Sequence, residues 1–135
     1  MSAAPFPSQL ELRCGPVTAI DLALFAAASG DHNPLHLDID TARAAGFDKP
    51  VVHGMLTMAY AGRLLSQHFG AGSVRALQTR FTGVAKLGDT VVLGATLTRA
   101  DAGEAHYTLH AHTVAGTELM TGQARVAGSA TAVPP

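Results

Sequence analysis

The C-terminal half of the chain alternates between apolar and polar residues. Over residues 90–98, and again over 106–112, every second residue is apolar, which is the period of a β-strand buried on one face. Glycine-containing turn sequences separate these runs, so neighbouring strands are expected to form hairpins. The pattern therefore predicts an antiparallel meander of four strands, at 73–82, 90–98, 106–112 and 119–126.

Apolar residues in the N-terminal half recur instead at helical spacing. A helix is predicted over 19–28, with Thr18 and Asp21 as a capping box and Gly30 as its end. A weaker alternating pattern before it predicts a first strand at 9–17. The face that this helix is expected to bury consists of Ile20, Leu24, Phe25, Ala27 and Ala28.

Two further helices are predicted between this helix and the strands. A short helix runs from Asp40, its expected cap, to Gly46, which would end it. The other, over 54–69, is apolar on nearly all sides, as is typical of a helix wrapped by other structure. The order of a strand, helices and then an antiparallel sheet indicates an α+β fold, in which the sheet curls around the apolar helix.

Composition narrows the class of protein. A chain of 135 residues is expected to form one domain, 1–135, with loosely ordered ends at 1–8 and 128–135. Only 14% of the residues are charged, so part of the surface is expected to be covered by another subunit. The net charge of −1 gives no reason to expect nucleic acid or an anionic membrane as a partner.

The cysteine content and hydropathy predict a compartment. Cys14 is the only cysteine, so no internal disulfide can form and a cytosolic setting is favoured. No apolar run reaches the roughly 18 residues of a membrane-spanning helix, and the start of the chain lacks the pattern of a signal peptide. We expect a soluble cytoplasmic protein.

The segment 29–36, Ser-Gly-Asp-His-Asn-Pro-Leu-His, concentrates polar chemistry in a chain that is otherwise poor in charge. Its Asp31 and His36 stand five positions apart on a turn that Pro34 stiffens. An ionised carboxylate and a neutral imidazole so placed can share a water molecule and act as base and acid. Two alternatives stay open: Asp31 could cap a turn, and His36 could be a half-buried structural histidine.

A second candidate element is the segment 50–56, Pro-Val-Val-His-Gly-Met-Leu. Gly54 opens the long apolar helix, where backbone amides are free and the helix dipole is positive. Such an end can stabilise a developing oxyanion, and a glycine lets a ligand approach the backbone closely. The alternative is that Gly54 only relieves crowding where the loop meets the helix.

The spacing of the histidines is a possible signal of metal binding. His32 and His36 have the spacing that aligns two ligands on a helix, but Pro34 between them disfavours a helix. Three strand histidines lie opposite the apolar face and are expected to point toward solvent or a partner: His106, His110 and His112. No metal site is predicted.

The residues of these two segments resemble a known family. Segment 29–36, together with Ala45-Gly-Phe47 and segment 50–56, is similar to the signature of the MaoC-like, (R)-specific enoyl-CoA hydratases. The resemblance implies a hot-dog fold, a long helix wrapped by a curved antiparallel sheet. It also implies a homodimer, or a higher oligomer, in which two sheets join edge to edge with active sites near the interface. The positions that match the signature are Gly30, Asp31, Asn33, Pro34 and His36.

The resemblance also implies an activity, the reversible syn addition of water to a trans-2-enoyl thioester of coenzyme A or acyl carrier protein. Asp31 would act as the base on water, the Asp31/His36 pair would manage the proton at Cα, and the Gly54 amide would hold the thioester oxygen. No metal or redox cofactor is implied. The residues expected to shape the turn or contact substrate are Asn33, His53, Met55, Leu56 and Tyr60.

Two other functions remain open for a chain of this kind. Hot-dog proteins include thioesterases, although these usually lack the Asp-x-Asn-Pro-x-His turn of residues 31–36. A non-catalytic acyl-thioester-binding subunit is the other, but such a subunit would have no need to keep both Asp31 and His36.

Overall fold

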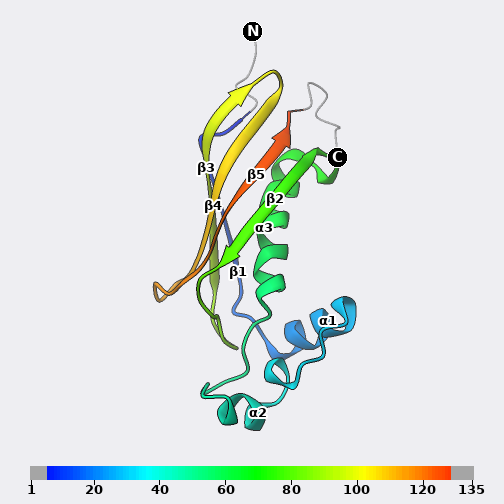
Figure 1. The fold of residues 1–135 in the computed structure, drawn as a ribbon, viewed down its shortest axis with the longest axis vertical. Helices are drawn as coiled ribbons and strands as arrows, with labels where there is room; N and C mark the ends of the chain where they lie inside the picture. Colours follow the sequence, from blue (N-terminus) through cyan, green and yellow to red (C-terminus); the bar gives the residue numbers. More distant parts are fainter. Residues whose placement is uncertain (1–5, 129–135) are drawn as a thin grey trace.

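A computed structural model describes residues 6–128 of the chain, and residues 1–5 and 129–135 lie outside this description. The strands and helices largely follow the sequence pattern (Figure 1). The elements, in chain order, are β1 (Gln9–Cys14), α1 (Ala19–Ser29), the 3-10 turn η1 (Pro34–His36), α2 (Ile39–Ala44), α3 (Gly54–Phe69), the 3-10 turn η2 (Ala71–Ser73), β2 (Val74–Phe81), β3 (Val91–Asp101), β4 (Glu104–Thr113) and β5 (Glu118–Ala127).

The strands form one antiparallel sheet in the order β1-β3-β4-β5-β2. The hairpins β3-β4 and β4-β5 confirm the predicted alternation and turns. The prediction of a meander of four successive strands is wrong at β2, which pairs with β5 rather than with β3. Because β1 occupies the other edge of β3, the strand that follows α3 joins the far side of the sheet.

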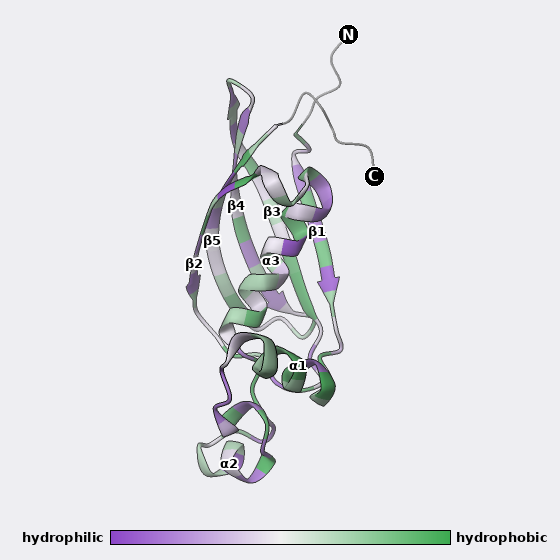
Figure 2. Cartoon of the chain, turned by 90° about the vertical axis from the view of Figure 1, so that its right-hand side faces the viewer, coloured by the Kyte–Doolittle hydropathy of each residue, from purple (hydrophilic) through white to green (hydrophobic). Residues whose placement is uncertain are grey.

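The sheet curves around α3, and the core lies between them (Figure 2). Tyr107, Leu109 and Ala111 of β4 point into this core and are each 1% exposed. From α3, Leu64 and Leu65 are fully buried against the sheet. Burying one leucine side chain contributes roughly 1.5–3 kcal/mol to the free energy of unfolding, so this interface is a major source of stability.

One face of α3 is open within the single chain. Gly54, Met55, Ala59, Arg63 and Gln67 are exposed along it. The expected curved sheet around the apolar helix is confirmed, and within one chain this sheet covers one side of α3.

Helix α1 confirms its predicted ends but not its predicted buried face. Thr18 and Asp21 form the capping box, and Gly30 ends the helix in a left-handed conformation with φ 79°. However, Leu22 is the fully buried leucine, whereas Ile20 and Leu24 are 70% and 65% exposed. Because α1 is apolar on several sides, periodicity alone does not choose the face that packs.

Helix α2 begins two residues earlier than predicted. Its cap is Asp38 and not Asp40, because the Asp38 carboxylate accepts hydrogen bonds from the Thr41 amide at 3.0 Å and the Thr41 hydroxyl at 2.6 Å. These bonds hold the pKa of Asp38 below its usual value. Asp40 instead lies in the first turn of the helix.

Part of each expected loose end is held by the sheet. The Tyr107 hydroxyl donates to the Pro7 carbonyl at 2.8 Å, and the Leu97 amide donates to the Ser8 carbonyl at 2.9 Å. At the other end, the Gly128 amide donates to the Gly103 carbonyl at 2.6 Å. Residues 7, 8 and 128 are therefore hydrogen-bonded to the rest of the fold, and residues 1–5 and 129–135 of the expected loose ends lie outside the described residues.

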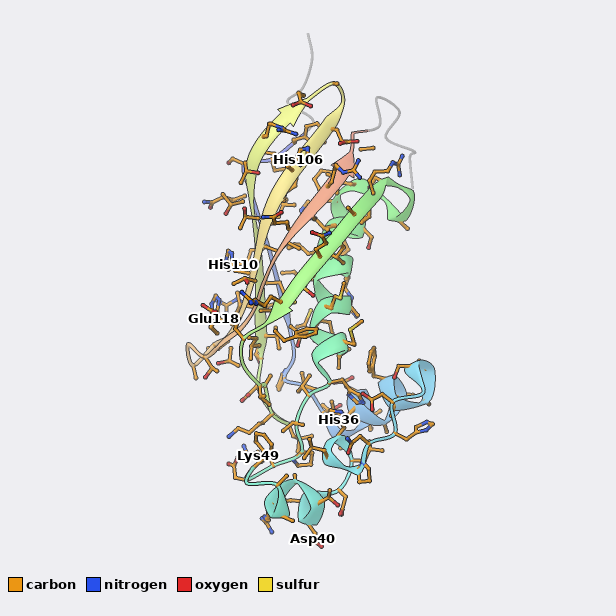
Figure 3. The ribbon with its side chains drawn as sticks, in the orientation of Figure 1. His36, Asp40, Lys49, His106, His110 and Glu118 are labelled. Carbon is orange, nitrogen blue, oxygen red and sulfur yellow. The ribbon has the colours of Figure 1, made fainter. Side chains whose placement is uncertain are left out.

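His110 projects from the outer face of the sheet, away from α3 (Figure 3). The alternation of burial along β4 places His106 and His112 on the same outer face, as predicted. His36 lies instead near the start of α3. Among the described helices, none combines the length and the apolar character that crossing a membrane would require.

Candidate active site

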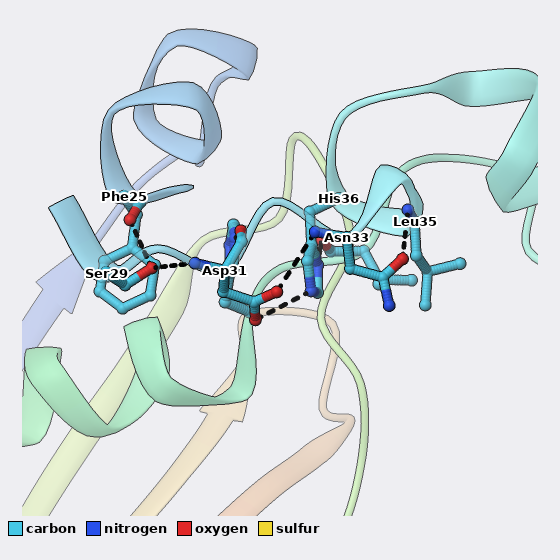
Figure 4. A network of polar contacts seen from close by, with 8 residues as sticks. Phe25, Ser29, Asp31, Asn33, Leu35 and His36 are labelled. Carbon is cyan, nitrogen blue, oxygen red and sulfur yellow. Dashed lines mark hydrogen bonds and ion pairs between the residues drawn. The ribbon is translucent and has the colours of Figure 1, made fainter. Parts of the chain in front are cut away.

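The turn between α1 and η1 is built by short-range hydrogen bonds (Figure 4). The Ser29 hydroxyl donates to the Phe25 carbonyl at 2.6 Å and accepts from the Asp31 amide at 3.1 Å. The left-handed Gly30 between them reverses the chain as α1 ends. Asp31 is thereby tied to the last turn of a helix, which fixes the direction of its side chain.

Asn33 and Pro34 shape the rest of the turn, as expected. The Asn33 side-chain oxygen accepts from the Leu35 amide at 3.0 Å and so caps η1, in which Pro34 is the first residue. The Asn33 amide donates to Oδ1 of Asp31 at 3.3 Å. Asp31 therefore does cap the turn through one oxygen, while its other oxygen is available for chemistry.

The second oxygen of Asp31 faces His36. Oδ2 lies 3.5 Å from Nε2 of the ring, and the two side chains are 48% and 11% exposed. The carboxylate thus stands at the solvent side of the pair, where a water molecule can reach it, and the imidazole stands behind it. The predicted acid–base pair is brought together by the fold.

The hydrogen bonding of His36 defines which ring nitrogen can take part. Nδ1 lies 2.8 Å from the Val51 carbonyl oxygen, which can only accept. Nδ1 therefore carries a hydrogen, and in the neutral ring the lone pair is on Nε2, the nitrogen that faces Asp31. A proton can pass to that nitrogen without any rotation of the ring.

Residues 50–53, which we call the strap, join the two sequence motifs in space. The Val51 amide donates to the Leu35 carbonyl at 3.1 Å, and the Val52 amide donates to the Ala85 carbonyl at 2.8 Å. The strap thus runs between the turn and the loop that precedes β3. It carries the Val51 carbonyl to His36 and places the start of α3 beside the pair.

His53, the last residue of the strap, is 1% exposed and touches both members of the pair. Its Nε2 lies 3.2 Å from the Asp31 carbonyl oxygen, and its ring stacks on that of His36 with 3.7 Å between centroids. Phe25 packs against the ring edge to face at 4.9 Å. Burial is the main cause that holds the pKa of His53 below its usual value.

Gly54 is the first residue of α3 and is exposed, as the proposed oxyanion site requires. The amides of Leu56 and Thr57 both donate to the His53 carbonyl, whereas the Gly54 amide has no hydrogen-bond acceptor among residues 6–128. A Cβ at this position would lie 3.5 Å from the Phe81 ring, which is ordinary contact. Crowding alone therefore does not require a glycine here, and the free amide at the positive helix end is the distinctive feature.

The other predicted contact residues lie farther along α3. Met55 is 54% exposed at the start of the helix, whereas Leu56 and Tyr60 belong to the core and are 8% and 7% exposed. Burial raises the pKa of the Tyr60 hydroxyl, and the Arg63 guanidinium lies 5.4 Å from the centre of the Tyr60 ring. Contact between substrate and any of these residues stays a prediction.

Two supporting groups were missed by sequence reasoning. The Ser29 hydroxyl pins the turn, but a serine at the end of a helix has many possible roles. The Val51 carbonyl selects the His36 tautomer. Every residue has a backbone carbonyl, so the sequence cannot show which one makes this contact. His32, which neighbours the pair in sequence, is exposed.

Asp31, His36 and His53 also meet a distance criterion for holding a metal ion. Each offers one ligand atom, and these atoms lie within 4.8 Å of one another, the only such group of three found in the part of the chain that the structure describes. Two of the four imidazole nitrogens of this group already lie at hydrogen-bond distance from backbone carbonyls. Within residues 6–128, the strand histidines His106, His110 and His112 form no such group.

Comparisons with known proteins agree with this geometry. The family model of the MaoC like domain matches residues 9–118, which include the turn and the strap. The (R)-specific enoyl-CoA hydratase of Aeromonas caviae is 38% identical over 112 residues, which cover 80% of this chain and 84% of that protein. The solved structure of the A. caviae (R)-hydratase superposes with a TM-score of 0.83 at 32% identity, over 94% of this chain and all of that one.

Other relatives are much longer proteins. The mouse peroxisomal multifunctional enzyme type 2 is 40% identical over 67 residues, but these are only 9% of its length. The 3-hydroxyacyl-thioester dehydratase Y of Mycobacterium tuberculosis is 40% identical over 95 residues, 66% of this chain and 33% of that protein. The family model matches most of the chain, and the curved sheet around α3 is like that of the hot-dog (R)-hydratases. This chain therefore belongs to the MaoC-like domain family.

Proposed function

We propose that the chain is an (R)-specific enoyl-thioester hydratase, which also catalyses the reverse dehydration of 3-hydroxyacyl thioesters. The main observation behind the proposal is the position of the Asp31 carboxylate, which lies 3.5 Å from Nε2 of His36 and is open to solvent on its other side. The named activities of the A. caviae and M. tuberculosis relatives support it.

The reaction begins with a water molecule held between Asp31 and His36. Asp31 takes a proton from this water, and the resulting hydroxide forms a bond to Cβ of the enoyl thioester. The π electrons move through Cα to the thioester oxygen, which gives an enolate. A proton from the Asp31/His36 pair then bonds to Cα, and the enolate electrons complete that bond.

The placement of both groups on one turn explains syn addition. Asp31 and His36 are held on the same side of the reaction by the hydrogen bonds of segment 29–36 and by the Val51 carbonyl. The water oxygen and the Cα proton are consequently delivered to the same face of the double bond.

The Gly54 amide is placed to stabilise the enolate oxygen. It is the first amide of a helix of 16 residues and has no acceptor among the described residues. One such donor lowers the free energy of an oxyanionic transition state by about 3 kcal/mol. The thioester itself acidifies Cα, so the proposed chemistry uses no metal and no redox cofactor.

The carrier of the acyl group is coenzyme A or acyl carrier protein. Relatives named for each carrier are similar to this chain: the A. caviae enoyl-CoA hydratase, and the mitochondrial 3-hydroxyacyl-[acyl-carrier-protein] dehydratase of Arabidopsis thaliana, 36% identical over 72 residues. Rates with the same acyl chain on each carrier will separate the two.

We also propose that two copies of the chain pair to complete the site. Strand β2 is an edge of the sheet and leaves one side of its backbone unpaired. Its last residue, Phe81, is 46% exposed and lies against Gly54, and the open face of α3 carries exposed Met55. A second copy on this side would cover apolar surface beside the pair. Sedimentation equilibrium should give twice the mass of the chain, and a monomer that retains full activity would contradict this part of the proposal.

The function is tested by following crotonyl-CoA and longer trans-2-enoyl-CoA substrates. Hydration removes the absorbance of the conjugated thioester without releasing a thiol. The thioester absorbance and the concentration of free thiol are therefore measured in parallel. Loss of absorbance without free thiol is expected, and chiral analysis should give the (R)-3-hydroxy product. Release of coenzyme A would identify a thioesterase instead, whereas binding without turnover would identify a non-catalytic subunit.

A further inference from the structure

His53 is a buried titratable group that the proposed mechanism does not use. It stands directly before Gly54 and is 1% exposed. Its ring contacts the backbone of one member of the acid–base pair and the side chain of the other. A buried imidazole in contact with both Asp31 and His36 can influence their position and their charge.

The hydrogen bond to Asp31 defines the tautomer of His53. The acceptor is the Asp31 carbonyl oxygen, 3.2 Å away, so Nε2 of His53 must carry the hydrogen. The other nitrogen, Nδ1, is buried with no hydrogen-bond partner among the described residues. A hydrogen on Nδ1 would be an unsatisfied donor on a buried charged ring, which is costly, so the ring is neutral with a bare Nδ1.

The stack on His36 has an electrostatic consequence. The two rings are nearly parallel, with 20° between their planes and 3.7 Å between centroids. If His53 stays neutral, a proton on His36 lies over a neutral aromatic face rather than beside a second positive charge. The titratable groups that face His53 are Asp31 and His36, while α1 contributes the apolar Phe25.

We infer that His53 is a positioning residue of the acid–base pair. Its Nε2–H donates to the Asp31 carbonyl and holds that backbone in place. Its neutral ring packs on His36, so the proton transferred during the reaction stays on Asp31 or His36 and does not pass to His53. The effect of His53 on catalysis rests on the proposed hydratase function, whereas its contacts and its protonation state do not. This role gives His53 a place behind the pair, in contrast to the substrate contact expected from sequence.

Two variants separate the donor from the ring. His53→Phe keeps an aromatic face against His36 but removes the hydrogen to Asp31, whereas His53→Gln keeps an N–H donor and removes the ring. In His53→Phe we expect kcat for crotonyl-CoA hydration to fall about tenfold to a hundredfold with KM nearly unchanged, because the carboxylate loses its alignment. In His53→Gln we expect a smaller loss of kcat, with a shift of the acid limb of the kcat–pH profile toward lower pH.

Ring nitrogen-15 NMR of the unsubstituted protein without substrate provides a readout independent of activity. At neutral pH, His53 should show the neutral tautomer with hydrogen on Nε2. A cationic His53 at that pH, or a neutral ring with hydrogen on Nδ1, would overturn the inference. So would a His53→Phe variant in which KM rises while kcat is unchanged, since that identifies a substrate contact.

The outcomes distinguish this inference from the proposed function. If the protein hydrates no enoyl thioester, the proposed function is refuted. The protonation state of His53 is measured by NMR without substrate, so that result tests the inference independently of the function. If His53→Phe does not fold, as judged by circular dichroism, the NMR result on the unsubstituted protein decides the question alone.

Discussion

The chain carries two groups of histidines, and they differ in what holds them. On the outer face of the sheet, His110 is exposed, His106 and His112 are partly exposed, and the His110 and His112 rings lie 6.1 Å apart. At the start of α3, the His36 and His53 rings lie 3.7 Å apart, and one nitrogen of each is at hydrogen-bond distance from a backbone carbonyl.

The difference shows how a fold turns a histidine into a defined acid or base. A backbone carbonyl accepts only, so each inner ring has one known tautomer and one nitrogen left for other use. No backbone carbonyl partner of His110 or His112 is found among residues 6–128, so nothing selects a tautomer there. His36 and His53 are therefore chemically specified, whereas His110 and His112 are not. Among the described residues of the outer face, only His106 has such a partner, because its Nε2 lies 3.0 Å from the Arg99 guanidinium, which can only donate.

The largest effect should come from substitution of the inner pair. Asp31→Asn and His36→Ala are each expected to lower kcat/KM for enoyl-thioester hydration by about 10²–10⁴-fold, the usual contribution of general acid–base catalysis. The exposed, outward-facing His110→Ala is the matched control and should keep the activity of the unsubstituted chain. Full activity in His36→Ala, or an equal loss in His110→Ala, would remove the distinction between the two groups.

A somewhat smaller effect is expected at the helix start. Gly54→Pro deletes one amide hydrogen at the first position of α3, where proline fits a helix. The rate should fall by about 10²–10³-fold, as for the loss of one oxyanion donor. Gly54→Ala keeps the amide and places its Cβ 3.5 Å from Phe81, so it should lose less. Equal losses in the two variants would indicate crowding rather than a missing donor.

The pH dependence of stability should report on His53. Its pKa is lowered in the folded protein, mainly by burial, so below about pH 6.5 the unfolded chain binds a proton that the folded chain does not. Stability is therefore full above that pH and decreases as the pH falls toward the folded pKa, by at most about 1.4 kcal/mol per pH unit for one proton. Urea unfolding should show a shallower acid slope in His53→Gln, and an unchanged slope would argue against a neutral buried ring.

The smallest expected effect is that of metal removal. Asp31, His36 and His53 have ligand atoms within 4.8 Å of one another, yet the proposed chemistry uses them as acid, base and support. Dialysis against EDTA should leave the rate of crotonyl-CoA hydration unchanged. An activity that disappears with EDTA and returns with zinc would make this trio a metal centre and give the inner histidines a different role.

Local sequence features predicted much of the fold. Helix α3 spans the predicted 54–69, and the Thr18/Asp21 capping box is present, because both depend on residues close in sequence. The neighbour of β2 was mispredicted, since alternation identifies a strand but not the edge at which it pairs. The buried face of α1 was mispredicted because apolar residues occur on more than one side of that helix.

The candidate site divides in a similar way. The turn motif predicted Asp31, His36 and the shaping roles of Asn33 and Pro34, all within eight residues of one another. The turn also predicted that the carboxylate and the imidazole can share a water molecule. The stack of His53 on His36 was not predicted, because these residues come from segments that only packing brings together.

By itself, the sequence determined which chemical groups are present and how the turn around Asp31 is bent, since proline, glycine and short polar side chains act on their own backbone. Only the tertiary structure decided which nitrogen of each inner histidine is free. That choice depends on a carbonyl 15 residues from His36 and another 22 residues from His53, and on burial that makes a charge on His53 costly. These contacts depend on how the strap packs between the turn and the loop that precedes β3, and no local sequence pattern encodes that packing.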